Sequence, residues 1–240
     1  MNAIPHDTIK KAIFKSQHCQ RNWDLNQQMP QEDLDLIVTA VTQCPSKQNV
    51  SHYNVHAITN REIIEKIYTF TKGFQINYKP AKDGDEMTNF GSYESVGNTQ
   101  LLANLLLIFE RKKIDLSQQD RYGAIRIIAN NGKNDPNSED IVVDSALALD
   151  VLMQDCHMAV GVAAGYANMT ATLLGYGTGC CTCFQGDKVI EYLNLQGNGP
   201  MLMMGIGFKD PELPRRVSHA NHDFVFPTFQ KNDIDVKYYN

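Results

Sequence analysis

The sequence predicts a single α+β domain, and three observations lead to this prediction. Residues 156–184 form a helix rich in alanine and glycine that enters a glycine turn and leaves as a short strand. Residues 101–109 are a near-continuous apolar run, which is typical of a strand covered on both faces. No internal repeat and no linker divides residues 1–240, so we expect one domain.

In the amino-terminal part, apolar spacing predicts three helices and a strand. The first helix covers residues 7–15. Pro30 opens the second helix, which ends before Pro45. Residues 53–59 alternate like a strand, and Asn60 caps the third helix. The buried stripes of the second and third helices are expected to comprise Leu34, Ile37, Val38, Val41, Ile63, Ile64 and Ile67.

Two segments without periodicity, 72–98 and 111–140, are interpreted as surface excursions that select the substrate. The second excursion is expected to contain one short helix near residues 121–129. Beyond them, we expect helices at 145–174 and 187–195, and strands that end at Phe184 and cover 201–208.

The alanine- and glycine-rich helix has two glycines, Gly161 and Gly165, that lie on one helical face. Each costs roughly 1 kcal/mol relative to alanine, so we expect another backbone or a flat ligand to approach closely there. The alternative is an ordinary core helix followed by a loop. Gly175, Gly177 and Gly179 are expected to supply a C-cap and a tight turn.

Composition excludes several classes of protein. Charged residues make up 20% and hydrophobic residues 42% of the chain, which is typical of a globular protein. The net charge of -5, with scattered Lys and Arg, argues against a nucleic-acid surface. Asn168 interrupts the longest candidate membrane segment, and the amino end has no signal-peptide core. Six cysteines are too few for a disulfide scaffold, which favours a reduced, cytoplasmic protein.

The common catalytic motifs are also missing. The cluster formed by Cys180, Cys181 and Cys183 lacks the paired spacing of a zinc site, so no metal is expected. There is no GxSxG, no P-loop and no Rossmann glycine motif between a strand and a helix. These absences favour a bound cofactor that carries the chemistry while the protein supplies the cradle.

Four pieces of the sequence, taken in order, resemble motifs of the FMN-dependent nitroreductase family. QHCQRNW, at residues 17–23, is similar to an RxSxRxF element, and CPSKQN, at 44–49, to an APSxxNxQPW loop. GYGTGCCTCF, at 175–184, resembles GLGTxWxxxF, and MLMMGIGFKDPELPRR, at 201–216, resembles LLxLGYPxxxPxxR. The resemblance covers most of the chain and is weakest over residues 72–143.

This resemblance implies a fold, a cofactor and an activity. The fold would be a mostly antiparallel central sheet flanked by helices, in an intertwined homodimer with two FMN sites at the subunit interface. The alanine- and glycine-rich helix would lie in that interface. The implied reaction is ping-pong electron transfer from NAD(P)H to nitro, quinone or similar electron-poor acceptors. Because hydride transfer takes place at flavin N5, no side chain is implied as catalytic. Dehalogenation, enoate reduction and flavin fragmentation remain open as related activities.

The resemblance also implies positions that bind FMN. Arg21 matches an arginine that contacts the phosphate or ribityl chain, while Gln17 and Cys19 stand where the family has arginine and serine. Either Arg215 or Arg216 matches a basic position that holds the phosphate.

Two further elements match parts of the family's flavin site. Pro45, Ser46, Lys47 and Asn49 match a loop that reaches FMN from the partner subunit, although His52 and Tyr53 replace the Pro-Trp that commonly follows. Backbone groups around Cys180, Cys181 and Thr182 match the strand beside the flavin ring. The replacements at Gln17 and Cys19 favour an alternative, a flavin-binding or structural dimer without turnover.

Overall fold

The computed structural model describes residues 3–71, 97–113, 145–218, 220–225 and 231–239. Within these residues the helices are α1 (His6–Ser16), α2 (Gln31–Thr42), α3 (Arg61–Tyr68), α5 (Ser145–Leu173) and α6 (Gly186–Leu193). The strands are β1 (Tyr53–Ile58), β2 (Leu105–Arg111), β3 (Gly177–Cys181), β4 (Pro200–Gly207), β5 (Val217–Ser218) and β6 (Asn221–Val225). Two 3₁₀ turns, η1 (Lys47–Asn49) and η2 (Thr99–Leu101), connect them.

Four strands form the central sheet in the order β1-β2-β4-β3, and every neighbouring pair is antiparallel. β2 and β4 occupy the centre, which explains why the apolar runs of both strands are nearly continuous. β1 and β3 form the two edges. The α+β prediction and the antiparallel sheet are therefore confirmed.

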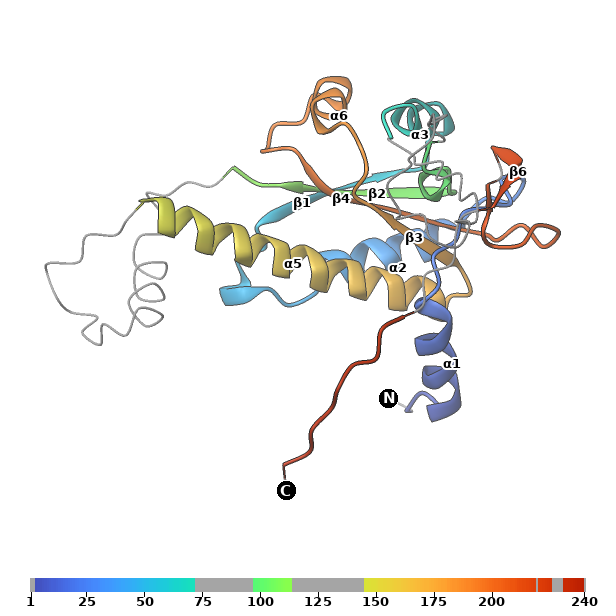
Figure 1. The fold of residues 1–240 in the computed structure, drawn as a ribbon, viewed down its shortest axis with the longest axis horizontal. Helices are drawn as coiled ribbons and strands as arrows, with labels where there is room; N and C mark the ends of the chain where they lie inside the picture. The colour runs from blue at the N-terminus through green and yellow to red at the C-terminus, as the bar shows by residue number, and fades with distance from the viewer. Residues whose placement is uncertain (1–2, 72–96, 114–144, 219, 226–230, 240) are drawn as a thin grey trace, which may run out of the picture.

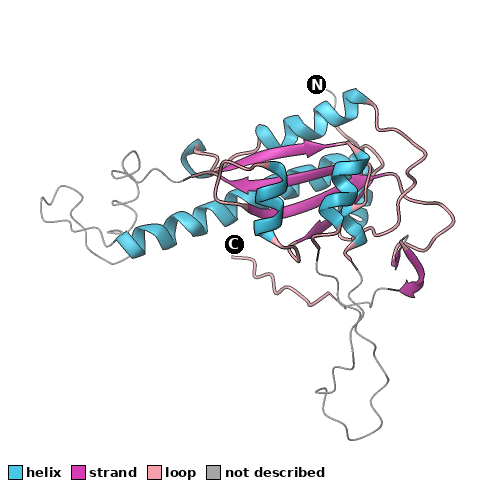
Figure 2. Ribbon diagram, turned by 90° about the horizontal axis from the view of Figure 1, so that it is seen from above, coloured by secondary structure: helices cyan, strands magenta, loops and turns pink. Residues whose placement is uncertain are grey.

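Helices cover both faces of the sheet (Figures 1 and 2). α5 and α2 lie on one face, where Leu105, Leu107 and Phe109 of β2 join the core. α3 and α6 lie on the other face, where Leu106 and Ile108 join a second core. Successive residues of β2 thus enter opposite cores, as the alternation of a strand requires.

The helix limits follow the signals in the sequence closely. The Asn60 side chain accepts a hydrogen bond from the Ile63 backbone N–H at 3.2 Å and so caps α3. At the end of α5, the Tyr176 N–H bonds the Ala171 carbonyl at 2.9 Å. Gly175 adopts φ +100°, the left-handed conformation that ends many helices.

Two strand limits differ from the prediction. The run at 101–109 begins with the turn η2, because the Asn98 side chain accepts a hydrogen bond from the Gln100 N–H at 3.1 Å. β3 ends at Cys181, so Phe184 forms only an isolated bridge with Thr71.

The glycine turn is also shorter than expected. Gly175 alone ends α5, while Gly177 and Gly179 belong to β3. Of the two surface excursions, residues 72–96 and 114–144 lie outside the described part of the chain, as does the short helix expected near 121–129.

Glycine in β4 lets the η2 segment lie directly on the sheet. A Cβ added at Gly205 would overlap the Gln100 carbonyl oxygen and would stand 3.0 Å from the Ala103 Cβ. The Gln100 carbonyl belongs to the backbone of η2, which packs on the sheet, so it cannot move away as the end of a flexible side chain can. Position 205 therefore admits no larger residue.

We expect Gly205→Ala to lower the free energy of unfolding by about 3 kcal/mol, because the added methyl group overpacks the core. Gly186→Ala is the matched control, since a Cβ there would approach only Pro200, at 4.0 Å. The control should change stability by less than about 0.5 kcal/mol. Urea unfolding followed by circular dichroism measures both variants, and equal midpoints would contradict the close approach.

Candidate functional site

The candidate site lies at the β3 edge of the sheet, where the segment after α1 meets the strand. Cys19 forms a parallel bridge with Thr178, and the Gln20 N–H donates to the Thr178 carbonyl at 2.7 Å. A Cβ on Gly179 would stand only 2.8 Å from the Gln20 carbonyl oxygen. Glycine at this position therefore lets residues 19–20 lie against β3, with Arg21 following directly.

A buried side-chain amide holds the segment that contains Leu213 and Pro214 against the segment after α1. The Asn22 side chain donates to the carbonyls of Leu213 and Pro214, at 2.5 and 2.7 Å. Gln20 in turn donates from Nε2 to the Asn22 carbonyl at 3.0 Å. This network places Arg215 beside the segment after α1, where its Nη1 lies 3.5 Å from the Cys19 carbonyl oxygen.

Four basic side chains consequently gather at this edge, and we call them the basic cluster: His18, Arg21, Arg215 and Arg216. Burial lowers the pKa of the half-buried Arg21, and the positive charges of Arg216 and Arg215 lower it further. Desolvation and the same two arginines lower the pKa of His18. The three arginines bring like charges together, which makes an anion favourable at this place.

The cysteines of β3 adjoin the basic cluster. Cys180 and Thr182 are exposed, whereas Cys181 is buried in the core on the sheet face that α3 and α6 cover, which we call the α3–α6 core. Cys19 and Cys183 are half-buried, and Cys183 lies close enough for the charge of Arg21 to lower its pKa. The predicted positions around Cys180 and Thr182 thus present accessible groups beside Arg21, while the Cys181 side chain faces inward.

Gln17, at the carboxyl end of α1, is exposed and directly precedes His18 of the basic cluster. Its amide can offer hydrogen bonds but no charge.

The loop at residues 45–49 lies elsewhere in the chain. It precedes β1, at the sheet edge opposite β3, so three strand spacings, roughly 14 Å, separate the two edges. Ser46 Oγ accepts a hydrogen bond from the Ser51 N–H at 2.9 Å, and Asn49 adopts φ 61°. Pro45, Lys47 and Asn49 are exposed. A single chain therefore does not bring this loop to the basic cluster.

Several residues that build the site were missed at the level of the sequence, because these residues have no recognised role in a motif. Asn22 and Gln20 orient the two arginine-bearing segments, and Trp23 anchors them by donating from Nε1 to the Thr99 carbonyl at 2.7 Å. Asn98 donates from Nδ2 to Cys183 Sγ at 3.4 Å. The one available hint was the concentration of amides in HCQRN, directly before the only tryptophan.

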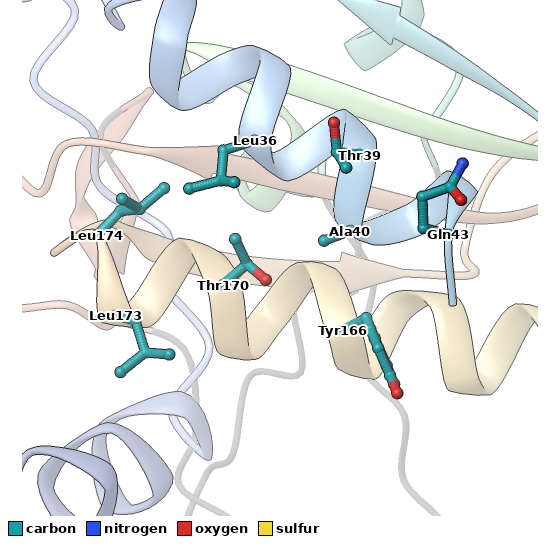
Figure 3. Close-up of a pocket in the computed structure, with 8 residues that line it drawn as sticks. All are labelled: Leu36, Thr39, Ala40, Gln43, Tyr166, Thr170, Leu173 and Leu174. Atoms are coloured by element: carbon teal, nitrogen blue, oxygen red, sulfur yellow. The ribbon is translucent and has the colours of Figure 1, made fainter. Parts of the chain in front are cut away.

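A groove of about 360 Å³ lies between α2 and α5 (Figure 3), and none of its lining residues belongs to the basic cluster. Its lining is mostly apolar or uncharged: Leu36, Thr39, Ala40, Gln43, Tyr166, Thr170, Leu173 and Leu174. With no carboxylate, imidazole, amine or thiol in its walls, the groove offers a packing surface rather than a reaction site.

Two further findings concern only the part of the chain that the structure describes. In it, no set of three or more His, Cys, Asp or Glu side chains is grouped as a metal site would require. None of its helices combines the length and the apolar character needed to cross a membrane.

Solved structures share this fold at low sequence identity. A nitroreductase family protein from Streptococcus pneumoniae is 17% identical with a TM-score of 0.56, covering 95% of this chain and 100% of that one. A Staphylococcus epidermidis protein, named provisionally as an NAD(P)H:FMN oxidoreductase, is 18% identical with a TM-score of 0.55, covering 89% and 94%. An Exiguobacterium sibiricum protein, solved in complex with FMN, is 15% identical with a TM-score of 0.54, covering 89% and 93%.

Sequence comparison identifies the family. No curated protein matches the chain. The sequence profile described as "Nitroreductase family" matches residues 15–208, which run from the end of α1 through β4 and include most of the segments that build the candidate site. The match covers well over half of the chain, and its fold is that of the solved nitroreductases. The chain belongs to the nitroreductase family.

Proposed function

We propose that this protein is an FMN-dependent oxidoreductase that transfers electrons from NAD(P)H to nitro, quinone or similar electron-poor acceptors. The observation that carries the proposal is the basic cluster at the β3 edge of a chain whose family consists of flavin-dependent oxidoreductases. Bound FMN would supply hydride acceptance and donation at its ring. The chain's own residues would bind, orient and shield that ring.

The residues at the β3 edge fit two chemical parts of FMN, the phosphate and the flat flavin ring. A phosphate dianion matches Arg21 and Arg215, since guanidinium forks bind phosphate oxygens in pairs. Burial of Arg21 strengthens this interaction, because a half-buried charge is less screened by water. The edge of the sheet is exposed at Cys180 and Thr182, so the backbone there, beside the basic cluster, could contact the flat flavin ring.

The family's second element, the loop at residues 45–49, would reach this site from a second copy of the chain. Within one chain the loop lies at the opposite edge of the sheet from Arg21. In a two-fold dimer that pairs unlike edges, Lys47 and Asn49 of one copy would approach the basic cluster of the other. In this arrangement both chains would contribute residues to each of the two sites.

Two surfaces of the single chain support such a dimer. α5 exposes Met158, Val162 and Tyr166, by 51%, 39% and 46%. Between them, a Cβ at Gly161 or Gly165 would meet nothing within 4 Å, so this face is open to another backbone. The α2–α5 groove adjoins it at Tyr166.

The carboxyl-terminal tail is the second such surface. Residues 231–239 are extended and exposed along their length, and they run away from the body of the chain (Figure 1). Among them, Ile234, Val236, Tyr238 and Tyr239 are exposed by 65% or more. These apolar side chains stand among charged ones in KNDIDVKYY, and packing on another subunit would remove them from water.

Two further parts of the proposal concern the domain organisation and the cellular compartment. Residues 1–240 would act as one domain whose excursions, within 72–98 and 111–140, select the acceptor. All six cysteines are free, which is compatible with the reducing environment of the cytoplasm.

Our first prediction for the site concerns cofactor affinity. The purified protein should be yellow and should release FMN, not FAD, on heating. Arg21→Ala should weaken FMN binding by about ten- to a hundredfold, the effect of one lost charge-assisted contact. Lys47→Ala, an exposed point charge, should weaken it less. Fluorescence titration of both variants measures the difference, and a colourless protein that takes up no added FMN would reject the assignment.

The second prediction concerns turnover. NAD(P)H oxidation with a quinone or nitro acceptor should show the parallel-line kinetics of a ping-pong reaction. Gln17→Arg adds a positive charge next to His18 and should tighten FMN binding by about tenfold, with little change in turnover at saturating FMN. If FMN-saturated protein oxidises no NAD(P)H, the alternative of a flavin-binding dimer without turnover replaces the enzyme.

The third prediction concerns assembly. Light scattering should give twice the chain mass of 27.0 kDa. Val162→Glu places a charge on the exposed face of α5 and should shift the population toward monomer. Tyr192→Glu is the matched control, because Tyr192 is similarly exposed, at 41%, but lies on α6 across the sheet. A monomeric wild-type protein would contradict the dimer, whatever its colour.

A further inference from the structure

The end of β3 carries a pair of thiols that the proposed function does not use. The sulfurs of Cys181 and Cys183 lie 3.2 Å apart. Both residues would face the same side in a regular strand, but β3 ends at Cys181, and the irregular step through Thr182 lets the two side chains converge. A disulfide bond measures about 2.05 Å, so the sulfurs need to approach by only about 1 Å to become bonded.

The two thiols differ in access. Cys181 is only 3% exposed and packs in the α3–α6 core, whereas Cys183 is half-buried and reachable from solvent. A reagent in solution therefore meets Cys183 first. Cys181 Sγ lies 3.2 Å from Cys183 Sγ, in position to attack that sulfur and to displace a group that Cys183 acquires.

The thiols also differ in chemistry. The hydrogen bond from the Cys181 thiol, together with that from Asn98 Nδ2 at 3.4 Å and the charge of Arg21, lowers the pKa of Cys183. The same hydrogen bond and burial raise the pKa of Cys181. The accessible sulfur is thus the better thiolate, which is the form that attacks disulfides.

We propose that Cys181 and Cys183 form a thiol–disulfide exchange site that low-molecular-weight disulfides oxidise to an intrachain disulfide. The Cys183 thiolate attacks one sulfur of the reagent, RSSR, forming a mixed disulfide and releasing RS⁻. Cys181 then attacks Cys183 Sγ, forming the Cys181–Cys183 bond and expelling the second RS group, which takes the Cys181 proton. Two electrons pass from the pair to RSSR, and two thiol equivalents leave.

The second step is favoured by the first. Once Cys183 is part of a mixed disulfide, it no longer carries the negative charge that kept Cys181 protonated. Cys181 then loses its proton more easily, at the moment when its neighbour becomes the electrophile.

Neighbouring cysteines provide an internal control. Cys180 is adjacent in sequence and more exposed than either member of the pair. Desolvation of its sulfur and the nearby Cys19 raise the pKa of Cys180 to about 11. Exposure alone would make Cys180 the reactive residue, whereas the proposal assigns that role to Cys183.

The test is oxidation of the reduced 240-residue chain by oxidised glutathione, followed by alkylation, chymotryptic digestion and mass spectrometry. We expect the peptide spanning Gly177 to Phe184 to lose two hydrogens, and dithiothreitol to restore them. In separate alkylation of the reduced protein at pH 7, Cys183 should react about tenfold faster than Cys180. The readout is the mass of the chain itself, so the result is independent of whether FMN binds.

Three variants identify the order of the two steps. Cys181→Ser should stop at a glutathionyl adduct on Cys183, and Cys183→Ser should form neither adduct nor disulfide at this site. Cys180→Ser should form the disulfide as the wild-type chain does. A disulfide that persists in Cys183→Ser, an adduct that accumulates on Cys180 instead, or a wild-type chain that resists excess oxidised glutathione would each overturn the proposal. Circular dichroism confirms that each variant is folded.

Discussion

The architecture of the site depends on the direct contact of backbone segments with the central sheet, which three glycines permit. Gly179 in β3 faces the Gln20 carbonyl, and Gly205 in β4 faces the Gln100 carbonyl. At Gly207 an added Cβ would overlap the Asn104 side-chain oxygen. A methyl group at any of these positions would lift the covering segment away from the sheet. Arg21 follows one of these segments directly, so its position is set by the packing of the sheet.

The second constraint is that the basic cluster gathers like charges that repel one another. The two arginine-bearing segments are held in place by uncharged groups, above all by the Asn22 amide bonded to the carbonyls of Leu213 and Pro214. The energy that opposes the repulsion therefore comes from buried amide hydrogen bonds and from the anchoring of Trp23. A site organised in this way has its arginines assembled before a ligand arrives, which reduces the ordering cost of binding an anion.

The sequence predicted the elements whose apolar pattern is strong. α2, α3 and α5 matched the prediction closely, because Pro30, Asn60 and Gly175 mark helix limits by local backbone chemistry. The predicted strand at 101–109 began four residues too early, because an apolar run does not distinguish a buried turn from a buried strand. There the Asn98 side chain, not the hydrophobic pattern, decides where η2 forms.

Candidate site residues were assigned from the sequence only where they matched a known motif. Arg21 and either Arg215 or Arg216 were assigned in this way, but the proximity of the two segments arises from contacts between residues almost 200 positions apart, which no local pattern encodes. Asn22 and Gln20 carry no motif, so their role became visible only in three dimensions. The pairing of Cys181 with Cys183 likewise depends on the early end of β3.

The separation of Arg21 and the loop at residues 45–49, at opposite edges of the sheet, has a genetic consequence in the proposed dimer. One chain damaged in the basic cluster and another damaged in the loop could associate into a mixed dimer. One of its two sites would then combine both defects, while the other would combine both intact elements. With equal expression and random pairing, half of the dimers would be mixed and half of their sites intact, so two alleles that are each inactive alone would together restore about a quarter of the activity. A cell could therefore carry both lesions without a complete loss of function.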